Sequence, residues 1–177
     1  MIKSKDSGQV DPKRTWIITG RERHVSTART DYLPYPQRAL RTKDYPYIIN
    51  FKPDRWPIGN PYGIEGDRIP TYEKLRDDIH ATFKDMDANP TKAWLVTNGK
   101  KPEWGKHYEL AFGKRPKEKL YILASDPDQI NNVALKSEYE SVRKKLHDQL
   151  MAELKRTGDP RVMGDGSTFD KLPYTRR

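Results

Sequence analysis

One helix, expected over residues 137–156, constrains the fold more than any other part of the sequence. Ser137 and Glu140 fit a capping box at its start, while Gly158 and Pro160 end it. Its apolar side chains recur at three- and four-residue steps and form one stripe, made of Leu135, Tyr139, Val142, Leu146, Leu150 and Leu154. A helix with one apolar stripe needs a second layer of structure against which to bury it.

The strands that could form this second layer come earlier in the chain. Leu120–Leu123 is a short apolar run typical of a strand, and Pro127 soon ends it because proline cannot donate to a β-ladder. Residues 37–42 and 45–51 indicate two further strands joined by a tight turn, which predicts an antiparallel hairpin. The sequence therefore predicts an α+β fold in which a long C-terminal helix packs on a small antiparallel sheet.

The remaining segments are shorter. Residues 15–20 are β-branched and aromatic and predict a buried strand that ends at Gly20. Shorter helices are expected over residues 71–83, 91–96 and 107–112, with Thr71 capping the first. No period follows residue 160, so a loop or flexible tail is expected there.

Composition narrows the class of protein and of partner. Apolar residues make up 34% of the 177 residues and charged residues 33%, which suits a layer that packs on something larger. The net charge of +9 favours polyanions such as sulfated glycan, anionic lipid or nucleic acid. Nucleic acid ranks last, because the basic residues are scattered and the aromatic residues alternate with Pro and Gly rather than forming a stacking platform. No stretch approaches the roughly 20 apolar residues of a membrane span, so none is predicted.

The motifs give a more specific indication. The run from Leu120 through Asp126-Pro127-Asp128 to Asn132-Val133-Ala134 resembles the signature near the C-terminus of type I sulfatases, most closely the N-sulfoglucosamine sulfohydrolase (heparan N-sulfatase) branch. Ile122 and Gln129 depart from that signature. Further matching segments, in family order, are Gly20–His24, Tyr35–Thr42, Tyr47–Phe51, Pro53–Pro57 and Thr157–Pro160.

This resemblance implies a domain arrangement. Residues 1–30 would be the tail end of the large, alkaline-phosphatase-like α/β domain, with residues 15–20 as its last strand. Residues 31–160 would be the C-terminal subdomain and residues 161–177 a flexible tail. The family implies a periplasmic or secreted protein, although residues 1–6 lack the apolar region of a signal peptide.

The resemblance also implies that the catalytic half lies outside this chain. Sulfatases of this type use a formylglycine made from Cys or Ser in a [C/S]-x-[P/A]-x-R segment, together with a calcium ion. This chain has no Cys, and the nearest serine match, Ser125–Gln129, ends in Gln. We therefore expect no catalytic residue and no metal ligand here. Calcium and formylglycine are expected in the missing N-terminal half, whose α/β domain would be the partner of this chain.

Substrate contacts are expected where residues 21–24 follow the first strand, because loops beyond strand ends line the ligand crevice of α/β sheets. Arg21 and Arg23 could grip a sulfate in a bidentate manner, and His24 could donate a hydrogen bond to it. His24 is the first choice. The alternative is a solvated loop in which Glu22 pairs with the arginines.

Three further residues are candidates for substrate binding. Arg38 is expected on the open face of the sheet or at the seam between domains. Arg55 and Trp56 lie in a loop whose aromatic and cationic side chains suit a sugar ring and an anion. The alternative for Trp56 is that it fills the inside of a long loop.

The expected function follows from the resemblance. The whole protein would hydrolyse a sulfate ester or a sulfamate on a glycan, and this chain alone would be inactive. Two alternatives stay open: a non-catalytic basic module that binds sulfated glycan through Arg55 and Trp56, and, ranked below it, a nucleic-acid binder.

Overall fold

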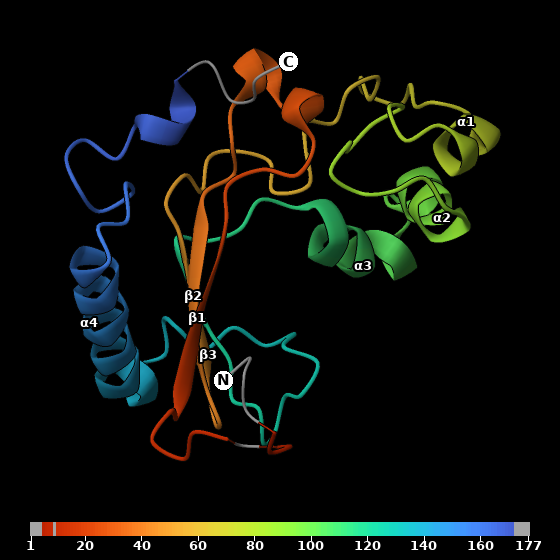
Figure 1. Ribbon diagram of the computed structural model, residues 1–177. Coiled ribbons are helices and arrows are strands. Elements are labelled where there is room, and N and C mark those ends of the chain that lie inside the picture. Colours follow the sequence, from red (N-terminus) through yellow and green to blue (C-terminus); the bar gives the residue numbers. More distant parts are fainter. Residues whose placement is uncertain (1–4, 9, 172–177) are drawn as a thin grey trace.

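The computed structural model describes residues 5–8 and 10–171 and has an α+β architecture (Figure 1). Four strands form one antiparallel sheet in the order β1-β2-β3-β4. The strands are β1 (Trp16–Arg21), β2 (Gln37–Thr42), β3 (Pro46–Asn50) and β4 (Glu118–Leu120). The α-helices are α1 (Tyr72–Asp77), α2 (Pro90–Asn98), α3 (Pro102–Phe112) and α4 (Glu140–Arg156). Single 3₁₀ turns are η1 (Ser26–Ala28), η2 (Thr30–Tyr32), η3 (Ser137–Tyr139) and η4 (Thr168–Asp170).

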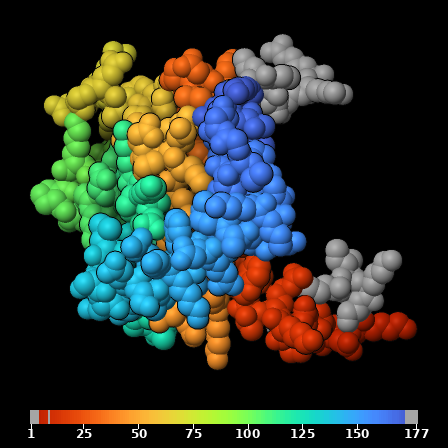
Figure 2. Space-filling model, turned by 90° about the vertical axis from the view of Figure 1, so that its left-hand side faces the viewer, coloured from red at the N-terminus to blue at the C-terminus, as the bar shows by residue number. Residues whose placement is uncertain are grey.

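The main core lies between α4 and one face of the sheet, as the sequence predicts. Leu146, Leu150 and Leu154 of α4 are buried there. They pack in one cluster with the sheet residues Leu40, Tyr47, Ile49 and Leu120. Figure 1 shows α4 running along this face, and Figure 2 shows the blue C-terminal residues beside the orange residues of the β2–β3 region. The small antiparallel sheet packed by a long C-terminal helix is therefore confirmed.

A second core, which the sequence does not predict, joins α1, α2 and α3. Leu75, Ala93, Val96 and Phe112 surround Phe83, and all five side chains are buried. The rings of Phe83 and Phe112 stack with their centroids 4.3 Å apart. These helices lie across the sheet from α4 and toward one end of it (Figure 1).

The start of α4 differs from its prediction. Ser137 lies inside the turn η3, and Tyr139 stands at the N-cap with no side-chain capping bond. The capping box of Ser137 and Glu140 is therefore wrong, because Ser137 is already part of the first turn rather than flanking it. Leu135 is also wrong as a stripe residue, since it is 90% exposed. The end of α4 is confirmed, because Gly158 has a left-handed φ of 71°.

The first strand differs most from its prediction. β1 is an edge strand that pairs antiparallel with β2, so residues 15–20 do not form a strand of a parallel sheet whose neighbours are missing. The strand is not buried on both faces either, because Ile17 is 48% exposed while Ile18 packs against the main core. This alternation is the pattern of a strand with only one covered face.

Other elements follow their predictions in type more than in length. The β2–β3 hairpin is confirmed. Thr71 caps α1 through a bond from the Lys74 amide, but α1 ends at Asp77 because Asp78 turns extended. α2 and α3 are longer than predicted. β4 begins earlier, at Glu118, and ends at Leu120.

The residues after Pro160 are attached to the rest of the molecule. Arg161 is buried, and Val162 packs against the main core. Residues 161–171 therefore contribute to the folded body, whereas the sequence predicts a flexible tail there. The rest of that predicted tail, 172–177, lies outside the described residues.

The main core generates the first prediction. Leu150→Ala should lower the free energy of unfolding by about 2–5 kcal/mol, because it removes a fully buried side chain between α4 and the sheet. Leu135→Ala is the matched control and should change it by less than about 0.5 kcal/mol, because Leu135 is exposed. Urea denaturation measures both variants. Equal losses would contradict this assignment of the core.

Candidate functional site

Side chains from segments far apart in the sequence meet in one network of ion pairs. Arg38 of β2 bonds Asp159 after α4 through Nε at 2.6 Å, and Glu22 after β1 through Nη2 at 2.8 Å. Its stem crosses Gly20, where a Cβ would lie only 2.8 Å from Arg38 Cδ. The glycine therefore leaves the space that Arg38 needs to reach both carboxylates.

The network continues through the C-terminal segment. Arg161 bonds Glu22 at 2.6 Å and Asp170 at 2.8 Å, and Asp170 also accepts from Arg55 at 2.7 Å. Three arginines thus alternate with three carboxylates: Arg38, Arg55 and Arg161 with Glu22, Asp159 and Asp170. With its charges balanced, this cluster offers no surplus cation to an anionic substrate.

The ion pairs of this network are largely buried, which makes them important for the fold. The side chains of Arg161 and Arg38 are only 1% and 8% exposed. Burial by itself raises the pKa of Asp170, but the bonds from Arg55 and Arg161 outweigh it and hold that pKa below its usual value. Burial likewise acts to lower the pKa of Arg161, and its bonds to Glu22 and Asp170 raise it instead. Both groups therefore stay charged in the fold.

Arg38 and Arg55 are thus structural residues rather than open substrate contacts. Arg38 lies on the side of β2 that faces α4 and the main core, so its predicted place on the open face is wrong, and its place at a domain seam stays a prediction. Arg55 also donates to the Pro34 carbonyl oxygen at 2.9 Å. Trp56 packs in the second core, with its ring centroid 6.2 Å from that of Phe83. The alternative, in which Trp56 fills the inside of its loop, fits the structure.

Arg21 and Arg23 each bond a backbone carbonyl oxygen through one guanidinium nitrogen. Arg21 Nη2 donates to the Pro57 carbonyl oxygen, and Arg23 Nη2 donates to that of Phe169 at 2.7 Å. The alternative of a solvated loop is only partly right, because Glu22 does pair with arginines, but with Arg38 and Arg161.

His24 differs from the other predicted site residues in its surroundings. Its side chain is exposed just beyond the end of β1. It makes no hydrogen bond or ion pair with the residues that the structure describes. The structure does not gather the six predicted residues into one pocket: the arginines and Trp56 support the fold, and His24 lies at the surface.

A buried pair that sequence reasoning missed fixes the loop after β3. Arg29 and Asp85 bond at 2.6 Å with side chains 3% and 0% exposed. Burial lowers the pKa of Arg29, and Asp85 only partly offsets this. Arg29 also donates to the carbonyl oxygens of Trp56 at 2.6 Å and Pro57 at 2.8 Å. No local pattern could have revealed a pair formed by residues so far apart in the chain.

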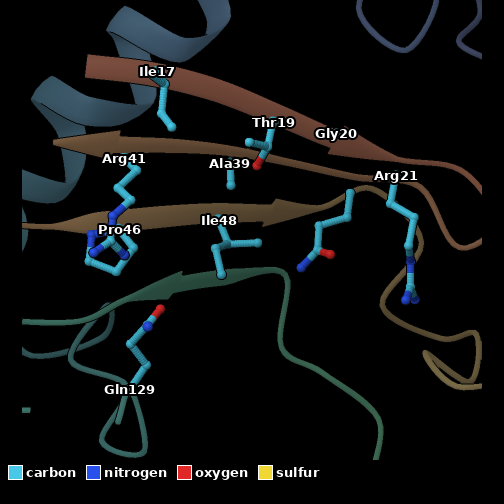
Figure 3. A pocket seen from close by; sticks show the side chains of 10 residues that line it. Ile17, Thr19, Gly20, Arg21, Ala39, Arg41, Pro46, Ile48 and Gln129 are labelled. Atoms are coloured by element: carbon cyan, nitrogen blue, oxygen red, sulfur yellow. The ribbon is translucent and has the colours of Figure 1, made fainter. Parts of the chain in front are cut away.

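The sheet face opposite α4 was also missed, and it is open. It holds a hollow of about 310 Å³. Figure 3 shows side chains of neighbouring strands directed into it and Gln129 approaching from the loop beyond β4. The lining residues are Ile17, Thr19, Gly20, Arg21, Gln37, Ala39, Arg41, Pro46, Ile48 and Gln129. Its centre is apolar, and its charged residues are arginines.

Lys119 belongs to the same face, because it lies opposite Ile48 in the β3–β4 register. Its ammonium group stands 5.3 Å from the centroid of the Tyr121 ring. Among the described residues it has no hydrogen-bond acceptor. Burial, and secondly the nearby Arg115, lower the pKa of Lys119 to about 8.

Two further features limit what this chain can do. Within residues 5–8 and 10–171, no three His, Asp or Glu side chains gather in a way that could hold a metal ion. None of the helices in that part of the chain combines the length and apolar character needed to cross a bilayer.

Comparison with known proteins finds similarity over only a part of the chain. No model of a known protein family matches the chain. An uncharacterized protein from Haemophilus influenzae is 31% identical over 55 residues. This match covers 31% of the present chain and 28% of the length of that relative.

The network generates the second prediction. Arg38→Met should lower the free energy of unfolding by about 3–5 kcal/mol, because it leaves Glu22 and Asp159 without a shared partner in a largely buried place. Arg156→Met is the control, since Arg156 is 70% exposed and pairs with Glu153 on the surface of α4. Its loss should be much smaller, because exposed ion pairs contribute little to stability. Chemical denaturation compares the two, and similar losses would count against a buried network.

The third prediction concerns pH. Because the pKa of Lys119 falls from 10.5 to about 8 on folding, the unfolded chain binds more protons between these values. The contribution of Lys119 should therefore make the free energy of unfolding rise with pH across this window. Lys119→Met should lack that rise, and Lys144→Met, at an exposed position on α4, should keep it. Urea titrations at about pH 7 and about pH 10 measure the difference. If the free energy of unfolding changed equally with pH in the unmodified protein and both variants, the assignment of this pH dependence to Lys119 would be refuted.

Proposed function

We propose that this chain is the C-terminal portion of a type I sulfatase that hydrolyses sulfate esters or sulfamates on glycans. The observation that carries the proposal is the convergence of the sulfatase-like segments on one network. Glu22, Arg38, Arg55 and Asp159 each come from a different matching segment, and Arg161 and Asp170 link them. Segments that match a family in order and also depend on one another structurally support a shared scaffold.

The signature after β4 has the same character. Asp126 accepts bonds from the amides of Ile130 and Asn131, at 3.0 and 2.9 Å. Asn132 Oδ1 accepts from the amides of Leu120 and Ala134, at 2.8 and 3.1 Å. The Asp and Asn of the signature thus form the turn that leads from β4 toward α4. Their roles are structural, which is what a supporting subdomain requires.

In this proposal the chain supports the fold of a larger enzyme. The open sheet face, apolar at its centre and cationic around it, would lie toward the α/β domain. That domain would supply the formylglycine and the calcium ion, and with them the attack on sulfur. His24, exposed beyond the end of β1, would be the residue of this chain that contacts the sulfated glycan. The family places such an enzyme in the periplasm or outside the cell.

The alternative of an independent glycan-binding module has less support. It relies on Arg55 and Trp56, and these side chains are engaged with Asp170 and with the second core. A nucleic-acid binder ranks last, because the arginines of the network are already neutralised by carboxylates.

The fourth prediction tests the proposal directly. The chain expressed alone should not turn over a chromogenic sulfate ester, with or without calcium, because the proposal places the nucleophile and the metal ligands in the upstream portion. The coding region upstream should contain a C-x-P-x-R or S-x-A-x-R segment and aspartate pairs. Expression of both regions together should give calcium-dependent hydrolysis.

A variant separates substrate contact from support. In the joined protein, His24→Ala should raise KM or lower kcat with little change in stability, because the side chain is exposed. His80→Ala, at an exposed position near the end of α1, is the matched control and should leave the kinetics unchanged. Calcium-dependent hydrolysis by the chain alone, or an upstream region without such a segment, would overturn the proposal.

A further inference from the structure

The two edge strands of the sheet, β1 and β4, differ in how their outward backbone groups are bonded. At the β4 edge, Asn132 Oδ1 accepts from the Leu120 amide at 2.8 Å, and the Val133 amide donates to the Leu120 carbonyl oxygen at 2.9 Å. Asn132 Nδ2 also donates to the Glu118 carbonyl oxygen at 3.2 Å. Three backbone groups on the outer side of β4 are thereby bonded by the chain itself, which blocks regular pairing of a further strand there.

The β1 edge has no such cover among the described residues. β1 pairs with β2 on one side, and nothing else in residues 5–8 and 10–171 bonds to its backbone between Trp16 and Gly20. Exposed edges normally carry charges, proline or bulges that discourage pairing with another strand. Residues 16–20 contain no charged residue and no proline, and their register with β2 is unbroken, so they form no bulge.

The side chains beside this edge indicate what kind of strand would fit. Ile17 is 48% exposed and offers an apolar contact next to the edge. A hollow of about 470 Å³ at the start of β1 is lined by Trp16 and Ile17 together with Arg14, Arg41 and Lys43. Among the described residues, no carboxylate lines it. Arg41 and Lys43 are exposed and form no ion pair within the described part of the chain.

We propose that the β1 edge binds an extended polypeptide segment as a fifth strand. The part of this segment that pairs with Ile17–Gly20 would be uncharged and rich in β-branched residues, and its end near Arg41 would be acidic. The backbone of the segment would satisfy the open groups of β1, and its carboxylates would pair with Arg41 and Lys43. A second copy of this chain fits less well, because β1 itself brings no acidic residue. The inference rests on the proposed function for the source of the segment, which is the larger portion of the enzyme.

Synthetic peptides test this binding mode. The probes are end-blocked peptides of five alternating valine and threonine residues with two glutamates either after or before them. The two orders report whether the added strand is parallel or antiparallel. Binding to the whole chain is measured by fluorescence anisotropy, and hydrogen exchange locates it. At least one acidic peptide should bind and slow exchange of the amides in residues 16–20.

Control peptides separate strand addition from charge attraction. A peptide with lysines in place of the glutamates should bind more weakly, and so should an acidic peptide with proline at its central valine. In the protein, Arg41→Glu should weaken binding of the acidic peptide about fivefold, the upper range for an exposed ion pair. Lys144→Glu, the same charge change on the far side of α4, should leave binding unchanged.

Each other outcome would overturn the inference. These are failure of both acidic peptides to bind, equal binding of the proline or lysine peptide, protection outside β1 only, or a dimer of the chain alone in sedimentation. The assay needs no sulfatase activity. A failure here would leave the proposed function standing, and an inactive joined protein would leave the binding mode standing.

Discussion

The structure depends on the pairing of Arg38, Arg161 and Arg55 with Glu22, Asp159 and Asp170 in a largely buried place. Removing such charges from water is expensive, and the loss is offset only when every charge has its partner. The chain must therefore bring together the end of β1, strand β2, the loop after β3 and the segment after α4. One interaction set thus fixes the positions of segments that are far apart in the sequence.

This requirement explains why a plausible anion site in the sequence serves the fold instead. Arginines beyond a strand end suit a sulfate as well as they suit a carboxylate, because both present paired oxygens to the guanidinium group. Residue type alone cannot distinguish the two partners. The distinction lies in Asp159 and Asp170, which reach the arginines only after the chain has folded back upon itself. His24 differs because no carboxylate faces it among the described residues.

The parts of the fold that sequence predicts well are those set by local periodicity. The spacing of Leu146, Leu150 and Leu154 predicts the buried face of α4, and Gly158 predicts its end. Both signals are local, because helix periodicity and left-handed backbone depend on residues a few positions apart. The direction of β1, the Arg29–Asp85 pair and the core around Phe83 depend on partners distant in sequence. The capping box failed for a related reason, since the same residue types serve a 3₁₀ turn equally well.

The distribution of charge connects these findings. The net charge of +9 does not come from the buried arginines, because carboxylates neutralise them. Arg41, Lys43 and Lys119 lie on or beside the open side of the sheet without such partners among the described residues. By charge complementarity, we expect such a surface to select an acidic polypeptide over a second basic copy of the chain. The same sheet is closed by α4 on one face and by Asn132 at one edge, so its uncovered face and edge are where a partner can add to the fold.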